Sequence, residues 1–498
     1  MTDPTEFPAS IPDLIPASIP ASIPVSLSAP ISEEPGNMIT NVVYDDIYIG
    51  QTAVQRRTLS ESDIQAFATV SGDVNPAHLD ADYADHTLFH GVIAHGMWGG
   101  ALISTVLGTQ LPGPGTIYLE QNLHFVKPVR IGDTLTVSAT VTAKEDLKKH
   151  VTLECKIVNQ HGAQVVFGNA LVIAPTEKVS RVRTRLPTMT MFDLGARQQA
   201  LLDSVRELAA VRCAVVHPCD ADSLKGALDA ASQGLIIPVL VAPLAKLTAV
   251  ALAANLDLSG IEIVDVAHSH AAAEKAVLMA ANGQVEALMK GSLHTDELMH
   301  AVVDCAALRT KRRLSHVFHL DVPMYHKVLL LTDAALNISP TLLEKADILQ
   351  NVIDLALALR ISEPKVAILS AVETVTPKIA STIDAAALCK MVERQQITGA
   401  IVDGPLAFDN AISAEAARIK GIASPVAGAA DILMVPDLES GNMLAKQFEY
   451  LAGASSCGVV LGARVPIALT SRADGPASRV ASAALVKLLA HQYRKCAP

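Results

Sequence analysis

A series of short apolar segments after residue 190 restricts the possible fold most strongly. Each segment ends in a polar residue, a glycine or a proline, and Ala-rich stretches with helical spacing separate most of them. Strands that alternate with helices in this way predict a mainly parallel α/β sheet, in two lobes, with ligands at the carboxyl ends of the strands. The segments are CAVVHP (213–218), IIPVLVAP (236–243), IEIVDV (261–266), VEALMKG (285–291), KVLLLTD (327–333), KVAILS (365–370), GAIVDGP (399–405), DILMVPD (431–437) and VPIALTS (465–471).

The residues before 176 follow a different pattern. Ser60 and Asp63 carry a capping signature that predicts a short helix, and a second helix that is apolar on every side begins near residue 95. A hairpin is predicted from residue 148 to 175, because apolar and polar residues alternate up to a turn at 160–162. Two more strands are expected to meet near Gly132 and Asp133. This part is predicted to be a small α+β domain.

The boundaries follow from these changes along the chain. We expect a Pro-rich flexible leader over 1–40, the α+β domain over 41–175, a charged linker over 176–190 and the α/β domain over 191–498. The leader contains an uncharged stretch, but its prolines exclude a helix and its first residues lack the basic charge of a signal peptide. It therefore predicts neither a membrane span nor a secretion signal.

Composition excludes several classes of function. The net charge of -11 argues against a general nucleic-acid binder. The seven cysteines are scattered and form no C-x-x-C pattern, which favours reduced thiols and a cytoplasmic location. The basic run KRR (311–313) is interpreted as loop charge rather than as a phosphate site.

The segment SGDVNPAHLD (71–80) is the first candidate site. Asn75 and Pro76 force a bend, and Asp73 and His78 flank it. A carboxylate and an imidazole on a loop suit general acid–base chemistry, although the same residues could simply cap a turn while the histidine packs nearby. The spacing of His86, His90 and His95 is compatible with metal ligands, but no carboxylate or cysteine pattern completes a site, so no metal is predicted.

The order D-x-N-P-x-H, then H-G-M, then an apolar helix and terminal strands resembles the MaoC-like, R-specific enoyl-CoA hydratases of the hotdog fold. The resemblance covers roughly residues 44–174. It implies that Asp73 and His78 act together on the water that adds to a trans-2-enoyl-CoA. We assign the thioester oxygen to the backbone N–H of Gly96. Asn75 and His95 are expected to contact the substrate.

The second candidate site lies in VPIALTSRADGPASR (465–479). Ser471 and Arg472 end an apolar strand, where a hydroxyl and a guanidinium suit a phosphate, although the arginine could equally cap the sheet or pair with Asp474. Residues 190–496 resemble the phosphate acetyl/butyryltransferase family through LMKGSLHT (288–295), LSHVFHLDVPMYHKVLLLTDAALNISP (314–340), DGPLAFDNAIS (403–413) and ADILMVPDLESGNMLAK (430–446).

This second resemblance implies that Ser471 and Arg472 contact phosphate and the thioester carbonyl. The acetyl-specific branch has an aspartate six residues after the arginine as base for the CoA thiol, and this chain has Ser478 there. Asp474 is the alternative base. Gly441 and Asn442 follow a strand at a predicted helix start, so they are expected to bind an anion.

Together the residues predict a fused enzyme in which both domains use CoA thioesters, one as a hydratase and the other as a phosphate acyltransferase. The expected partners are enoyl-CoA, acyl-CoA and inorganic phosphate, with no cofactor, no nucleic acid, no membrane and a homo-oligomeric state. Two alternatives remain open. The C-terminal domain could be a weakly active acyl-CoA-binding or oligomerisation module, which Ser478 would suit, or the first domain could be a hotdog thioesterase.

Overall fold

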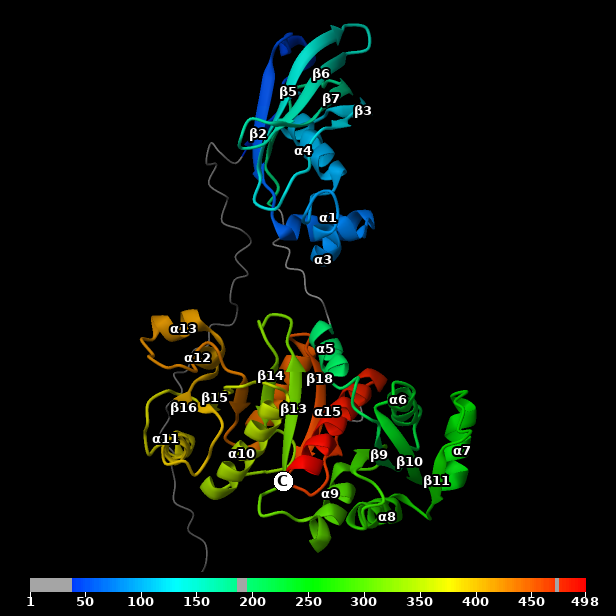
Figure 1. Ribbon diagram of the computed structural model, residues 1–498. Coiled ribbons are helices and arrows are strands. Elements are labelled where there is room, and N and C mark those ends of the chain that lie inside the picture. The colour runs from blue at the N-terminus through cyan, green and yellow to red at the C-terminus, as the bar shows by residue number, and fades with distance from the viewer. Residues whose placement is uncertain (1–37, 186–194, 471–473) are drawn as a thin grey trace, which may run out of the picture. The chain divides into compact units, whose positions relative to one another are not determined.

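The computed structural model describes residues 38–185, 195–470 and 474–498, and they form two compact units (Figure 1). Residues 1–37 of the predicted leader and residues 186–190 of the predicted linker lie outside the described residues. Among the helices of the described residues, none is both long and apolar enough to cross a membrane.

The first unit is an antiparallel sheet with one long helix against it, as the sequence predicted (Figure 1). The strands pair in the order β2-β5-β6-β7-β3, and β4 also pairs with β7. The predicted hairpin is β6–β7, and its alternating side chains at 151, 153, 155 and 157 are fully buried. The elements are β1 (Met38–Thr40), β2 (Thr52–Thr58), α1 (Glu61–Ser71), α2 (Pro76–Leu79), α3 (Ala81–Asp85), α4 (Gly96–Thr109), β3 (Ile117–Gln121), β4 (His124–Phe125), β5 (Thr134–Glu145), β6 (His150–Val158), β7 (Gln164–Ile173) and β8 (Ser180–Val182), with a 3-10 turn at Tyr44–Asp46.

Two short strands extend the first unit beyond its predicted limits. β1 pairs with β8, which lies inside the predicted linker. The side chain of Asn41 joins the two ends of the unit, because it donates to Glu177 O at 2.8 Å and accepts from Val179 N at 2.8 Å. Asn41 is 1% exposed. Residues 38–41, before the sheet, are therefore bonded to residues 177–182, after it.

A fragment of residues 1–185 is expected to fold by itself. The residues that form its core cluster all lie between 42 and 174, and the fragment also keeps the β1–β8 pair. We expect a cooperative unfolding transition by circular dichroism. A fragment ending at residue 178 serves as the matched comparison, because it lacks β8 and the Asn41–Val179 hydrogen bond, so it should be less stable by about 1 kcal/mol or more. A 1–185 fragment without cooperative unfolding would contradict this division of the chain.

The second unit is built on one sheet of eleven strands. Each of the predicted apolar segments forms a strand, and helices cover the sheet (Figure 1). The elements are α5 (Ala196–Ser204), β9 (Val211–Val216), α6 (Ala221–Ser232), β10 (Ile236–Ala242), α7 (Leu244–Ala253), β11 (Glu262–Asp265), α8 (Ser269–Ala281), β12 (Ala287–Lys290), α9 (Thr295–Asp304), β13 (Ser315–Asp321), β14 (Leu329–Thr332), α10 (Leu342–Ala358), β15 (Lys365–Leu369), α11 (Ala380–Glu393), β16 (Ile401–Leu406), α12 (Phe408–Ile412), α13 (Ala414–Ile419), β17 (Ile432–Met434), α14 (Leu438–Tyr450), β18 (Ser455–Leu461), β19 (Ile467–Ala468) and α15 (Pro476–Lys495), with a 3-10 turn at Ala306–Leu308.

The sheet is mixed rather than wholly parallel. Its order is β11-β10-β9-β12-β19-β18-β13-β14-β17-β15-β16, and β13 runs antiparallel to both of its neighbours, as β18 does to β19. The α/β class is therefore confirmed, but the two predicted lobes share one continuous sheet whose central strands reverse direction.

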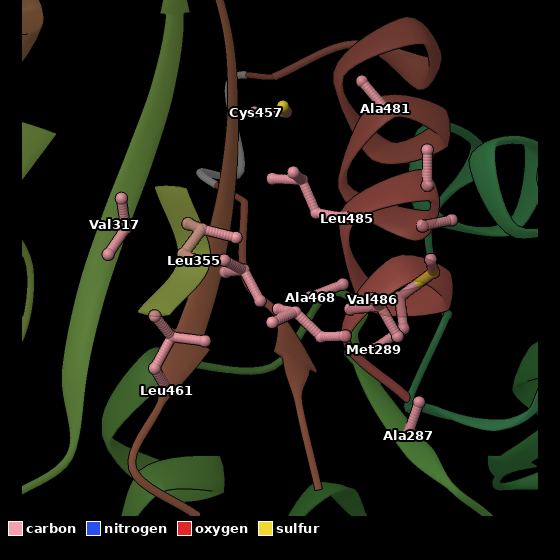
Figure 2. Packing of buried hydrophobic residues seen from close by; sticks show 14 of the residues in the cluster. Ala287, Met289, Val317, Leu355, Cys457, Leu461, Ala468, Ala481, Leu485 and Val486 are labelled. Carbon is pink, nitrogen blue, oxygen red and sulfur yellow. The ribbon is translucent and has the colours of Figure 1, made fainter. Parts of the chain in front are cut away.

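Helix α15 packs against the middle of this sheet. Leu485 and Val486 of α15 point toward Ala468 of β19 and Met289 of β12 (Figure 2). These residues belong to one buried cluster that also includes Leu461 of β18. The helix that follows residues 471–473 is thus fixed to the strands that precede them.

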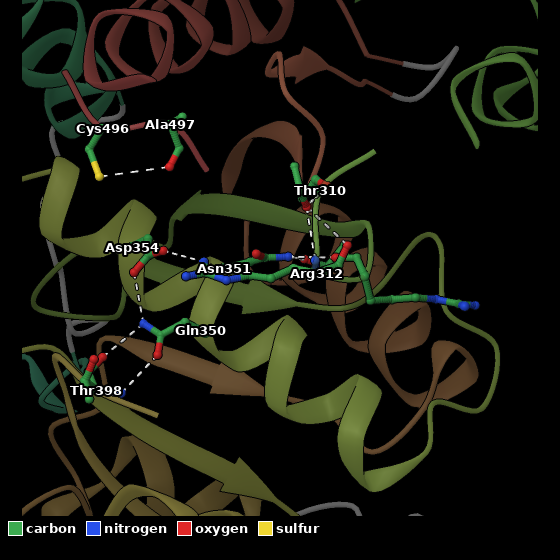
Figure 3. A network of polar contacts seen from close by, with 11 residues as sticks. Thr310, Arg312, Gln350, Asn351, Asp354, Thr398, Cys496 and Ala497 are labelled. Atoms are coloured by element: carbon green, nitrogen blue, oxygen red, sulfur yellow. Dashed lines mark hydrogen bonds and ion pairs between the residues drawn. The ribbon is translucent and has the colours of Figure 1, made fainter. Parts of the chain in front are cut away.

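The basic run at 311–313 pairs with acids of helix α10. Asp354 accepts hydrogen bonds from Arg312 and from Gln350, which also reaches Thr398 O (Figure 3). Arg313 forms an ion pair with Glu344 at 3.0 Å. These charges therefore join a loop to a helix of the same unit.

Candidate active sites

The first candidate site is the bend between helices α1 and α2. Helix α1 starts at the predicted capping box of Ser60 and Asp63 and ends at Gly72, whose φ of 75° suits glycine. Asn75 then caps α2 by accepting from Ala77 N at 3.1 Å, and Pro76 takes the first helical position. Asp73 therefore lies on a loop, whereas His78 lies on a one-turn helix instead of the predicted loop.

The structure brings Asp73, His78 and His95 together. One nitrogen or oxygen atom from each side chain lies within 4.8 Å of the others. The His78 and His95 rings have centroids 4.0 Å apart. His95 Nε2 is 3.0 Å from the backbone oxygen of Asp73, so this histidine holds the Asp73 loop as well as lying beside it. Asn75 donates its backbone N–H to Asp73 Oδ1 at 3.2 Å, and its side chain is used in the helix cap.

Helix α4 begins at this site, and the N–H group of its first residue, Gly96, has no acceptor among the described residues. His95 is its cap residue, but its side chain makes no capping hydrogen bond. A Cβ at position 96 would lie 3.2 Å from the Phe125 ring, so glycine keeps this approach open. A cavity of about 250 Å³ opens here, lined by His78, His95, Gly96, Trp98 and Phe125 among others. A developing negative charge in the cavity would meet the positive end of the helix.

The second candidate site adjoins Thr470, the last described residue before the gap at 471–473. Ser471 and Arg472 lie outside the described residues. A cavity of about 580 Å³ is lined by Thr470, by Thr295 and Asp296 at the start of α9, and by Asn442 and Lys446 of α14. It therefore lies next to the ends of β12 and β19, where the sequence analysis expected a ligand.

Gly441 does not serve the predicted purpose. It lies in the second turn of α14, where its N–H donates to Asp437 O at 3.2 Å, and the Asp437 side chain caps the helix start. A Cβ at position 441 would lie 2.8 Å from Asp333 O and 2.9 Å from Ala334 Cα, so the glycine allows two segments to approach closely. Asn442 lines the cavity, and its side chain donates to Ala334 O at 3.3 Å.

Two buried cations beside the second site were not predicted. Arg479 donates from Nη1 to Thr470 Oγ1 at 2.9 Å and to Lys290 O at 3.3 Å, and Lys290 Nζ is 3.5 Å from Thr470 O. Both cations are 2% exposed. Burial lowers the pKa of Arg479, while the charges of Asp220, Asp474 and Asp222 oppose this effect. Lys290 is the last residue of the apolar strand β12, and this position in the sequence could have indicated a functional lysine.

Asp474 lies close to the cations of this region. Burial lowers the pKa of Lys446, but the hydrogen bond and charge of Glu449, with a smaller contribution from Asp474, raise it overall. The negative charge of Asp474 also acts on Arg479. Ser478, at the position where the family branch has an aspartate, is part-buried on the first turns of α15.

Replacing Gly226 of α6 with alanine is expected to disturb the second site through Arg479. The added Cβ would lie 2.7 Å from Arg479 Cδ and 2.8 Å from its Cβ, so the arginine, which donates to Thr470, must shift. We expect a loss of about 1–3 kcal/mol in the free energy of unfolding, measured by denaturant titration. Lys225→Ala is the matched control, since it removes only an exposed pair with Asp229 and should cost less than about 0.5 kcal/mol. Equal stability of both variants would show that Arg479 has room to move.

Comparison with known proteins matches each unit separately. Residues 268–486 match the family model described as phosphate acetyl/butaryl transferase, and residues 48–161 match the MaoC like domain. A phosphate acetyltransferase of Rhizobium meliloti is 60% identical over 300 residues, which cover 60% of this chain and 95% of that protein.

Two solved structures are similar to the two units. A branched-chain phosphotransacylase from Enterococcus faecalis V583 is 30% identical, with a TM-score of 0.50, over 56% of this chain and 99% of that one. The unliganded R-hydratase PhaJ1 from Pseudomonas aeruginosa is 47% identical, with a TM-score of 0.30, over 31% of this chain and 99% of its own.

Proposed function

Because the chain belongs to the phosphate acetyl/butaryl transferase family and carries a MaoC-like domain before that region, we propose that it catalyses two separate reactions on CoA thioesters. The first unit adds water to trans-2-enoyl-CoA to give (R)-3-hydroxyacyl-CoA. The second unit transfers an acyl group between CoA and inorganic phosphate. The observation that carries the first activity is the grouping of Asp73, His78 and His95 beside the start of α4.

Hydration needs a proton acceptor for water, a proton donor for the α-carbon and a hydrogen bond for the thioester oxygen. Asp73 and His78 accept a proton from the water whose oxygen bonds to the β-carbon. The pair returns a proton to the α-carbon, so the site recovers its starting charge. The N–H of Gly96 stabilises the negative charge that gathers on the thioester oxygen meanwhile.

Acyl transfer forms a bond between a phosphate oxygen and the thioester carbon and breaks the bond from that carbon to sulfur. We assign phosphate and the carbonyl oxygen to Ser471 and Arg472, next to the cavity at Thr470. CoA leaves as a thiolate and then takes up a proton, and in the reverse direction Asp474 is the proposed base for the thiol. Its charge already acts on Lys446, which lines the same cavity.

Two assays test these assignments on the full chain. Loss of the enoyl absorbance of crotonyl-CoA reports hydration, and phosphate-dependent release of CoA from acetyl-CoA and butyryl-CoA reports transfer. Release of CoA from saturated thioesters without phosphate would instead identify a thioesterase in the first unit. Hydration without any phosphate-dependent release would leave the second unit as a CoA-binding module. The same assays over a series of chain lengths would define the acyl substrates.

A further inference from the structure

Each imidazole of the first site donates one ring N–H to a backbone carbonyl. His78 Nδ1 is 2.9 Å from Ile93 O, and His95 Nε2 is 3.0 Å from Asp73 O. A carbonyl oxygen can only accept a hydrogen bond, so these two nitrogens carry the ring protons. In the neutral rings, Nε2 of His78 and Nδ1 of His95 are therefore left with lone pairs.

The lone pair of His95 is buried and unused. His95 is 3% exposed, and the described part of the chain offers no hydrogen-bond partner to its Nδ1. A buried polar atom without a partner is destabilising, because it has lost its hydrogen bonds to water. His95 also lines the cavity that contains His78. Such an atom in such a place indicates that a ligand outside the chain binds there.

Asp73 adds a carboxylate to the two imidazoles. One ring nitrogen of each histidine and a carboxylate oxygen of Asp73 lie within 4.8 Å of one another. Zinc binds nitrogen and oxygen ligands at about 2.0–2.2 Å, which places the ligands roughly 3.5 Å apart around the ion. The side chain of Asp73 is exposed, and within the described residues it accepts one hydrogen bond, from Asn75 N at 3.2 Å, so its carboxylate has free lone pairs for an ion.

We propose that Asp73, His78 and His95 bind a divalent transition-metal ion such as Zn²⁺, and that the bound ion inhibits hydration. Two neutral imidazoles and one carboxylate form a suitable ligand set, with water in the fourth position. Backbone carbonyls that accept the other ring N–H groups orient such ligands. The inhibition rests on the proposed function, because the ion occupies the carboxylate and the lone pair that hydration requires.

This site differs from the one that the spacing of histidines suggested. His86 and His90 are exposed, and their Nδ1 atoms lie near Asp82 O and Asp85 O. His95 is the one histidine that the two sets share. The sequence pattern of histidines had no carboxylate ligand beside it. In the structure Asp73, twenty-two positions before His95 in the chain, provides one.

Calorimetric titration of the full chain with Zn²⁺ tests the binding directly, and Co²⁺ gives a visible absorption band when it is held by such ligands. All samples carry Cys496→Ser, which removes an exposed thiol. We expect one site per chain. Asp73→Asn and His95→Asn should each raise the dissociation constant at least about tenfold. The matched control is the double variant His86→Ala/His90→Ala, which should bind like the parent.

The hydratase assay separates this inference from the proposed function. Inhibition by Zn²⁺ at the concentration that fills the site supports both. Zn²⁺ binding that depends on Asp73 and His95, in a chain without hydratase activity, would retain the metal site and reject the proposed reaction. Full hydratase activity with no site-dependent Zn²⁺ binding would reject the metal site alone. Binding lost in the control double variant would also overturn it.

Discussion

Replacing Asp73 with asparagine is expected to slow the hydration of crotonyl-CoA by at least about a hundredfold, the usual scale for a lost general base. The amide keeps the size of the side chain but cannot take a proton from water. The backbone oxygen that accepts from His95 Nε2 is unchanged, so His95 should stay in place. Phosphate-dependent CoA release should also stay at the parental rate, because it belongs to the other unit.

Asp82→Asn provides the matched control for this variant. Asp82 is an exposed carboxylate on the nearby helix α3, and its replacement removes the same charge from the same region. A general effect of charge would slow both variants alike. A near-parental rate in Asp73→Asn would show that the bend between α1 and α2 has only a structural role. Unfolding curves for both variants should match the parent within about 0.5 kcal/mol.

Strands β13 and β18 were not predicted, and without them the sheet was expected to be parallel. β13 (SHVFHLD) contains two histidines and an aspartate, yet every residue in it is buried. β18 (SSCGVVL) begins with small and polar residues. Neither matches a continuous apolar run. Although His316 Nδ1 and Asp321 Oδ2 have no hydrogen-bond partner among the described residues, tertiary contacts bond other polar atoms of β13. Asp321, for example, pairs with Arg197 at 2.9 Å.

The lengths of the connections between strands could have predicted which strands are antiparallel. Residues 322–328 join β13 to β14, and residues 462–466 join β18 to β19. A parallel pair needs a crossover of about a dozen residues or more, so connections this short require antiparallel pairing. In contrast, β9 and β10 are joined through helix α6 and β15 and β16 through helix α11, and both pairs are parallel, as the sequence predicted.

In the first site, contacts between residues close in sequence could be predicted, whereas contacts between distant segments could not. The Asn-Pro bend lies between Asp73 and His78, as the spacing indicated, although His78 lies on the short helix α2. The hydrogen bond from His95 to Asp73 O joins segments far apart in the sequence, and no local pattern contains it. Likewise, Arg479 reaches Lys290 only because α15 packs on the sheet beside β12.

Replacing Arg472 with lysine is expected to cost on the order of 2 to 4 kcal/mol in transition-state stabilisation of acyl transfer, through a higher KM for phosphate and a lower kcat. Lysine keeps the charge but loses the planar pair of donors that fits a phosphate. Residue 472 lies outside the described residues, but Thr470 before it lines the cavity and is held by Arg479.

Arg464→Lys is the matched control, because Arg464 is an exposed arginine just before β19 and should be replaceable without loss. Asp474→Asn adds a test of the thiol base. A loss at neutral pH that is partly recovered at alkaline pH, where the CoA thiol with a pKa near 8.5 ionises unaided, would support Asp474 in that role. Unchanged rates at both pH values would exclude it. If Arg472→Lys proved as active as Arg464→Lys in a chain with measurable transferase activity, the assignment of phosphate to this arginine would be wrong.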